Sequence, residues 1–353
     1  MIKIRRKWRS TNDAEVGTGH LTRERALIVL AILISLLVLA VLAALVTGSE
    51  EIPGIQLLHA LSSAVVGMPS RLTPEQETIL FQIRLPRVAL AIGVGAALAL
   101  SGAAFQSLLR NPLADPYVLG ISGGAAVGSM MANILFPGYG SVQMAGGFIG
   151  AGLAMSAVYQ IGRRKDDPAH LVLAGVIMST MLSSFIVLMT ALADSLQLRR
   201  ITLWLLGDLS TGTGSAAIFV LVVSLLAGLV LTGRARALNL MMIGERDAFA
   251  LGIETTRVRW QVYLMASLLT AAAVTAGGAI GYVGLVVPHL IRLAAGADNR
   301  LVIPASAIGG AILVLIADMI ARTVIAPREL PTGAIIALLG APVFLFLLIR
   351  GRR

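Results

Sequence analysis

Long uncharged stretches rich in apolar residues alternate with short charged loops along the chain. A helix needs about 20 apolar residues to cross a bilayer. Stretches near that length cover residues 26–46, 88–109, 116–136, 141–162, 169–193, 213–233, 301–317 and 332–349. A ninth stretch, 260–291, is longer than one span but shorter than two, and we divide it near Gly278 into one full and one short span. The pattern predicts ten transmembrane helices and no soluble domain.

Positive charge sets the expected orientation of these helices. Basic residues crowd the start of the chain, and Arg350, Arg352 and Arg353 close it. Because short cytoplasmic loops are enriched in Lys and Arg, both termini are expected in the cytoplasm, and the number of spans is then even. The ten-span topology also places most of the 28 Lys and Arg residues on the cytoplasmic side. The predicted fold class is an all-α polytopic membrane protein.

Composition agrees with this topology. Hydrophobic residues make up 57% of the 353 residues and charged residues only 13%, and the mean hydropathy is +0.88. The formal net charge of +10 would suit a nucleic-acid partner. Basic cytoplasmic loops explain it better, because they orient the spans in the bilayer. The lipid bilayer, and no nucleic acid, is therefore the expected environment.

The loops and ends define the domain organisation. In order, it comprises a basic cytoplasmic arm at 1–25, a ten-helix domain at 26–350 with outer segments at 47–83 and 194–211 and an inner loop at 234–259, and a tail at 351–353. Prolines frame a short surface helix in the first outer segment, and Trp204 anchors an interfacial helix in the second. The inner loop is predicted to form two short amphipathic helices, broken at Gly244 and ended at Gly252.

Residues for enzyme chemistry are scarce. The chain has no cysteine, and its four histidines lie far apart without the spacing of a metal site. It also lacks the Gly-x-x-x-x-Gly-Lys-Ser/Thr loop that binds nucleotide phosphates, because none of its lysines follows a glycine. We expect no metal, no cofactor and no catalytic residue on this chain.

Charged residues near the ends of spans are the exception to this scarcity. Asp318 and Arg322 are four residues apart on the ninth span, a spacing that favours an ion pair within the helix. Arg84 and Arg87 lie where the second span is expected to start. With Arg322 they form a predicted positive rim at the external mouth, suited to an acidic protein or an anionic substrate. Interfacial snorkelling of the same arginines is the alternative.

Glycines recur at helical spacing in two neighbouring spans. Gly120, Gly124 and Gly128 fall on one face of the third span, and Gly146 and Gly150 repeat the spacing in the fourth. Small residues four apart allow two helices in a membrane to approach closely. The pattern predicts helix packing at these positions.

Five separated motifs stand out along the chain. They are Arg84-Leu85-Pro86-Arg87, the run from Gly95 to Gly124, the loop from Gly244-Glu245 to Leu251-Gly252, the stretch from Gly278 to Arg292, and a last set made of Ala317-Asp318, Ala321-Arg322, Glu329-Leu330-Pro331-Thr332-Gly333 and Gly340-Ala341-Pro342. In this order, the motifs resemble the iron-siderophore, haem and cobalamin permease family of ABC importers. The resemblance covers about residues 26–350. It implies an ABC importer permease fold in the bacterial cytoplasmic (inner) membrane, paired as a homodimer or with a similar subunit. The translocation path would then run between the fifth and tenth spans.

The same resemblance implies two further partners. A substrate-binding protein, periplasmic or surface-bound, would dock through its glutamates on Arg84, Arg87 and Arg322. A separate ATP-binding cassette ATPase dimer would bind ATP and Mg²⁺, so this chain needs no cofactor of its own. The inner loop would couple to that ATPase through Gly244, Glu245, Arg246, Ala248, Leu251 and Gly252. Alternating access without covalent chemistry is the implied mechanism.

Two other classes of function stay open at this point. An ion-coupled secondary transporter would need carboxylates at the membrane midplane, and only Asp318 comes near it. A structural membrane scaffold would need no uptake at all. Within the resembled family, ferric siderophore, haem and cobalamin are not separated by these residues, and family breadth favours an iron chelate.

Overall fold

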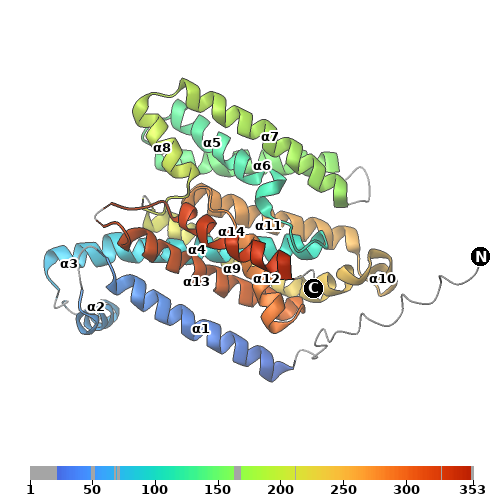
Figure 1. The fold of residues 1–353 in the computed structure, drawn as a ribbon, viewed down its shortest axis with the longest axis horizontal. Coiled ribbons are helices and arrows are strands. Elements are labelled where there is room, and N and C mark those ends of the chain that lie inside the picture. Colours follow the sequence, from blue (N-terminus) through green and yellow to red (C-terminus); the bar gives the residue numbers. More distant parts are fainter. Residues whose placement is uncertain are drawn as a thin grey trace, which may run out of the picture.

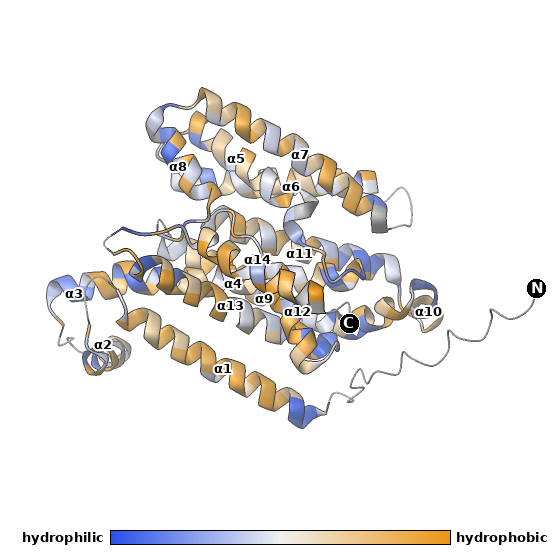
Figure 2. Cartoon of the chain, viewed as in Figure 1, coloured by the Kyte–Doolittle hydropathy of each residue, from blue (hydrophilic) through white to orange (hydrophobic). Residues whose placement is uncertain are grey.

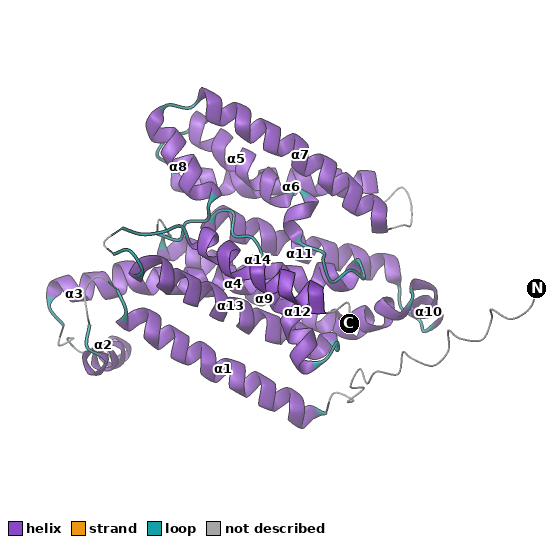
Figure 3. Cartoon of the chain, in the orientation of Figure 1, coloured by secondary structure: helices purple, strands orange, loops and turns teal. Residues whose placement is uncertain are grey.

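The computed structural model describes residues 22–48, 52–66, 69, 72–162, 168–210, 212–326 and 328–350. Most of the predicted basic arm and the tail at 351–353 lie outside these ranges. The described residues form helices joined by short loops, with no strand among them (Figure 3). The elements are α1 (Arg23–Val46), α2 (Gly54–Val66), α3 (Pro74–Thr78), the π-helical η1 (Ile79–Arg84), α4 (Leu85–Leu108), the 3₁₀-helical η2 (Pro116–Leu119), α5 (Ile121–Leu135), α6 (Gly140–Gly162), α7 (Pro168–Leu192), α8 (Ser195–Leu205), α9 (Gly214–Ile243), α10 (Glu245–Ala250), α11 (Thr255–Gly277), α12 (Val283–Ala295), α13 (Asn299–Thr323) and α14 (Thr332–Arg350).

Each predicted span corresponds to a helix. Seven helices of the described chain are long and apolar enough to cross a membrane, and α5, α12 and α14 are shorter apolar helices in the remaining predicted positions. Hydrophobic residues run along α1 and α7, while hydrophilic residues gather at α3, α8 and α10 (Figure 2). The all-α membrane fold is thus confirmed, and the count of ten spans stays a prediction.

The helices form two groups (Figure 1). One group contains α5, α6, α7 and α8, and the other contains α4, α9 and α11 to α14, with α1 along its far edge. The second group is built around α4, which packs on α9, α11, α12 and α13. The most apolar window of the helix ending at Leu108 is 83% buried, whereas that of α1 is not buried at all. The helix α4 is therefore the core of the described molecule.

Glycines bring α4 close to two of its neighbours. A Cβ atom on Gly102 would lie 1.9 Å from the carbonyl oxygen of Gly284 in α12, and one on Gly95 would lie 2.3 Å from that of Gly310 in α13. Real Cβ atoms do not approach an oxygen so closely, so any side chain at either position would push the helices apart. These contacts explain why α4 fits between its neighbours.

The second span begins much earlier than the sequence predicts. The expected start was near residue 88, but the helix is continuous from Pro74 to Leu108. A π-helical turn, in which the Leu85 N–H donates to the Leu80 carbonyl, precedes Pro86 and absorbs the hydrogen bond that proline cannot make. Arg84 and Arg87 therefore lie inside a packed helix and not at its free end.

The inner loop also differs from its prediction. The first of the two expected short helices is the end of α9, which continues without a break to Ile243. The second is α10, separate as expected, between Gly244 and Gly252. In the second segment predicted to be outside, α8 follows Asp194, whose carboxylate caps it by accepting from the Gln197 N–H. The outer segment 47–83 holds α2 and α3 where a single short helix was expected.

Candidate functional site

The three arginines of the predicted outer rim are buried together. Arg84, Arg87 and Arg322 are each less than 9% exposed, and with Asp318 and Glu329 we call them the outer arginine cluster. The Asp318 carboxylate, fully buried, accepts from the Arg87 Nε at 3.0 Å and contacts the Arg322 Nε at 3.1 Å. The predicted Asp318–Arg322 pair is therefore confirmed. The Asp318 carboxylate thus pairs with two arginines at once. These ion pairs offset part of the cost of burying the charges of Asp318, Arg87 and Arg322.

The cluster also closes the end of α1. Arg84 donates to the carbonyls of Leu45 and Val46, and Arg322 donates to that of Ala44. The last carbonyls of a helix have no partner within it and attract positive charge. Arg84 and Arg322 supply these carbonyls with hydrogen-bond donors and with positive charge. The cluster therefore joins α1 to the helix ending at Leu108 and to α13.

Glu329 is the exposed member of the cluster. It lies in the loop between α13 and α14, and its Oε2 atom accepts from the Arg87 Nη1 at 2.8 Å. Its side chain is 44% exposed, compared with 1% for that of Asp318. Sequence reasoning noted Glu329 only as part of a motif. No spacing rule links it to Arg87, which is 242 residues away along the chain.

A cavity of about 350 Å³ opens beside these side chains. Its lining comprises Gly48, Ile79, Ile83, Arg84, Arg87, Arg322, Ala326 and Glu329. The arginines thus reach a hollow at the end of the molecule that the topology predicts to be outside, even though their surfaces are mostly covered. The predicted docking of a binding protein here stays a prediction, since the structure holds no partner chain.

In the loop predicted to be cytoplasmic, α10 is held in place by ion pairs and by a glycine. Glu245, in its first turn, pairs with Arg259 of α11 and lies 3.8 Å from Arg110, in the turn after α4. The helix ends at Gly252, whose φ of +82° belongs to the left-handed region that favours glycine. There the Ile253 N–H donates to the Ala248 carbonyl, a Schellman end.

The outward face of α10 is apolar. Ala248 is fully buried towards the helices that α10 packs on, α9 and α11, whereas Phe249 and Leu251 are 70% and 66% exposed. Arg246 is exposed beside them. An exposed aromatic and a leucine next to charged residues are typical of a surface that a protein partner covers. The residues predicted for coupling therefore lie on one short, well-fixed helix and its two ends.

A second polar site lies at the opposite end of α4. Arg292 of α12 donates to the Ala103 carbonyl at 3.2 Å, to the Ser107 hydroxyl at 3.0 Å and to the Asn299 side chain at 3.3 Å. Asn299 and Ser107 are buried. Asn239 of α9 joins them by accepting from the Asn299 N–H at 2.9 Å. We call these residues the inner arginine junction, and sequence reasoning assigned it no role.

The glycine faces of α5 and α6 meet. A Cβ on Gly124 would lie 2.6 Å from the carbonyl oxygen of Gly150, and one on Gly128 would lie 2.2 Å from that of Gly146. Gly120 differs, because it precedes α5 in a left-handed conformation with a φ of +76° and faces α7. Close packing therefore depends on Gly124 and Gly128, and a turn conformation depends on Gly120.

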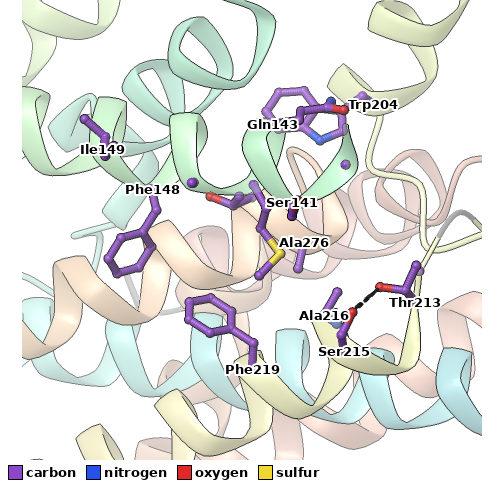
Figure 4. Close-up of a pocket in the computed structure, with 15 residues that line it drawn as sticks. Ser141, Gln143, Phe148, Ile149, Trp204, Thr213, Ser215, Ala216, Phe219 and Ala276 are labelled. Atoms are coloured by element: carbon purple, nitrogen blue, oxygen red, sulfur yellow. Dashed lines mark hydrogen bonds between the residues drawn. The ribbon is translucent and has the colours of Figure 1, made fainter. Parts of the chain in front are cut away.

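A larger cavity of about 780 Å³ lies between α6, α9 and α11. Phe148 and Phe219 form an edge-to-face pair with ring centres 5.8 Å apart, and Thr213 and Ser215 share a hydrogen bond (Figure 4). No charged residue lines this cavity. Among the described residues, moreover, no group of His, Asp and Glu is placed to hold a metal ion.

Comparison with known proteins agrees with this arrangement. The chain is 40% identical over 282 residues to the hemin transport system permease protein of Yersinia pestis, covering 78% of this chain and 84% of that one. It is 39% identical to the vitamin B12 import system permease protein of Vibrio cholerae, over 78% of this chain and 84% of the other. It is 34% identical to the molybdate import system permease protein of Haemophilus influenzae, over 84% and 87%.

A solved structure and a family model lead to the same conclusion. A metal-chelate type ABC transporter in an inward-facing conformation matches with a TM-score of 0.80 and 30% identity, covering 92% of this chain and 99% of that one. The model of the FecCD transport family matches residues 36–350. The chain therefore belongs to the FecCD transport family, as a permease of an ABC importer and not as an enzyme.

Proposed function

We propose that this permease moves an iron chelate, in the first place a ferric siderophore, inward across the bacterial cytoplasmic membrane. Support for a bulky metal chelate comes from the relatives named for hemin and vitamin B12 and from the metal-chelate type of the matching structure. The observation that carries the proposal of ATP-driven transport is the exposed apolar face of α10, a short fixed helix that follows the long helix α9. Such a face suits contact with a separate ATPase. The proposal includes a topology with both termini in the cytoplasm.

In this proposal, ATP and Mg²⁺ are bound by a separate ATPase dimer and not by this chain. The apolar face of α10, with Phe249 and Leu251, enters a groove of that subunit. Because α10 follows α9 after Gly244 alone, closure of the ATPases reaches the membrane helices through one short connection. Differential binding of ATP to the closed state supplies the free energy that shifts the permease between its two orientations.

On the outer side, a substrate-binding protein docks with acidic side chains at the outer arginine cluster. Arg84, Arg87 and Arg322 line the 350 Å³ cavity there and offer fixed guanidinium groups. Guanidinium groups bind carboxylates in a planar, two-pronged geometry. A second permease subunit, most simply a copy of this chain, completes the path between α7 and α14.

Reconstitution tests the proposal. The permease and its ATPase are reconstituted in vesicles, and the cognate binding protein is added outside. These vesicles should take up a radiolabelled ferric siderophore only when ATP is enclosed in the lumen, which corresponds to the cytoplasm. Replacing both Phe249 and Leu251 by Ala should abolish uptake and weaken ATPase assembly, because these exposed side chains form the proposed contact. Replacing the exposed Phe136 and Tyr139, at a turn predicted to be outside, by Ala serves as the control and should leave ATPase assembly unchanged. Full uptake by the α10 variant would refute the coupling role.

Cobalamin is the second candidate substrate. The relative from Vibrio cholerae, named for vitamin B12, is nearly as similar as the one named for hemin. Mass spectrometry of the ligand retained by the purified binding protein separates the candidates. A retained corrinoid, with uptake of labelled cobalamin and none of an iron chelate, would replace the siderophore proposal.

A further inference from the structure

The outer arginine cluster holds two carboxylates that differ in how firmly they are bound. Asp318 is buried and accepts from Arg87 and from the Thr332 hydroxyl at 3.2 Å, and Arg322 pairs with it as well. Glu329 reaches Arg87 through one carboxylate oxygen and is 44% exposed. A partly exposed ion pair contributes little to stability, whereas a buried one is costly to break. Only the Glu329 contact is therefore readily exchanged.

Glu329 also lies where an exchange would affect a membrane helix. Its loop joins α13 to α14 and is attached to the cluster at neighbouring points. The Leu330 N–H donates to the Ala321 carbonyl at 3.0 Å, and Thr332, the first residue of α14, bonds to Asp318. The Arg87–Glu329 pair is thus one of the contacts that fix the start of α14.

We propose that Glu329 occupies Arg87 as an internal stand-in for an acidic side chain of the binding protein, and that docking displaces it. The incoming carboxylate enters the cavity that Arg87, Arg322 and Glu329 line. One carboxylate replaces another of equal charge, so Arg87 and the buried Asp318 keep their compensation throughout. Displacement releases the loop before α14, and an empty permease therefore keeps that loop fixed until a binding protein arrives. The inference rests on the proposed docking at this cluster.

The affinity of the binding protein tests this exchange. In the reconstituted permease–ATPase complex, Glu329→Gln removes the competing charge and should lower the Kd of the substrate-loaded binding protein about 2- to 5-fold. Glu75→Gln is the matched control, because Glu75 is an exposed carboxylate in α3 without a contact to Arg87. It removes the same charge from the outer side and should leave the Kd unchanged.

A second background separates this inference from the docking proposal. Arg87→Lys keeps the charge opposite Asp318 but loses the two-pronged geometry, so the effect of Glu329→Gln should shrink in that background. If Glu329→Gln leaves the Kd unchanged or raises it in the otherwise natural chain, the stand-in role is overturned. The docking proposal still stands in that case if the Kd rises with salt and with Arg87→Lys. A Kd indifferent to both salt and Arg87→Lys overturns the docking proposal itself.

Discussion

Two arginines hold opposite ends of α4, and their partners differ in charge. At the outer end, Arg87 pairs with the carboxylates of Asp318 and Glu329. At the inner end, Arg292 donates to a backbone carbonyl, a hydroxyl and an amide oxygen. Within the described residues, no carboxylate forms an ion pair with Arg292. Charge-assisted bonds between ions are stronger than bonds to neutral oxygens, and they also leave less charge uncompensated.

The difference indicates two mechanical roles. The outer cluster can trade one carboxylate for another, since both forms are neutralised, and it opens on a cavity. The inner junction has only fixed acceptors from α4 and α13, and Asn239 extends it to α9, the helix that leads to α10. We therefore expect the inner junction to move as one rigid piece with α9, and the outer cluster to be the place where contacts change.

The largest effect is expected from removing the shared carboxylate of the outer cluster. Asp318→Asn leaves the buried Arg87 and Arg322 without their common counter-charge, which should lower the free energy of unfolding by about 3–5 kcal/mol. Denaturant unfolding of the detergent-solubilised permease measures it. Glu329→Gln is the control and should change the free energy by less than about 1 kcal/mol. Equal effects of the two variants would erase the distinction between a fixed and an exchangeable carboxylate.

A smaller effect is expected at the inner junction. Arg292→Gln removes hydrogen bonds from a charged donor, each worth about 1.5–3 kcal/mol, and we expect a total loss within that range. The loss is limited because the Ser107 hydroxyl already donates to the Asn299 oxygen at 2.8 Å, so that oxygen keeps a partner. The same unfolding measurement applies. A loss larger than that of Asp318→Asn would show that the inner junction, and not the outer cluster, holds α4.

Much of the fold could be predicted from the sequence because membrane spans obey simple rules. Length and apolarity located a helix for each expected span, and the Asp318–Arg322 pair followed from helical spacing. The start of the second span was missed, since the charged and polar residues of 74–84 do not look like a membrane helix. That error made Arg84 and Arg87 seem exposed, whereas burial places them among internal partners.

Contacts between distant segments could not be predicted in the same way. Glu329 meets Arg87, and Arg292 meets Ser107, only because α4 packs between α12 and α13. Periodicity describes one helix at a time and contains no information on which helices become neighbours. The glycines Gly95 and Gly102 were visible in a family motif, but their partners Gly310 and Gly284 were identified by the packing alone.

The smallest effect on stability is expected at Glu245, the inner counterpart of Glu329. Its side chain is 28% exposed and pairs with Arg259 and, at 3.8 Å, with Arg110. Glu245→Gln should therefore cost no more than about 1 kcal/mol, and less at high salt, which screens a partly exposed pair. Under the proposed coupling, uptake should nevertheless fall, because the pair fixes α10 to α11 and to the end of α4, and a loosened α10 would transmit less of the movement of the ATPase. Uptake and unfolding free energy are measured for both Glu245→Gln and Glu329→Gln, to decide whether the inner and outer ion pairs differ in role. If the two variants change uptake to the same extent, then the inner and outer pairs do not differ in role.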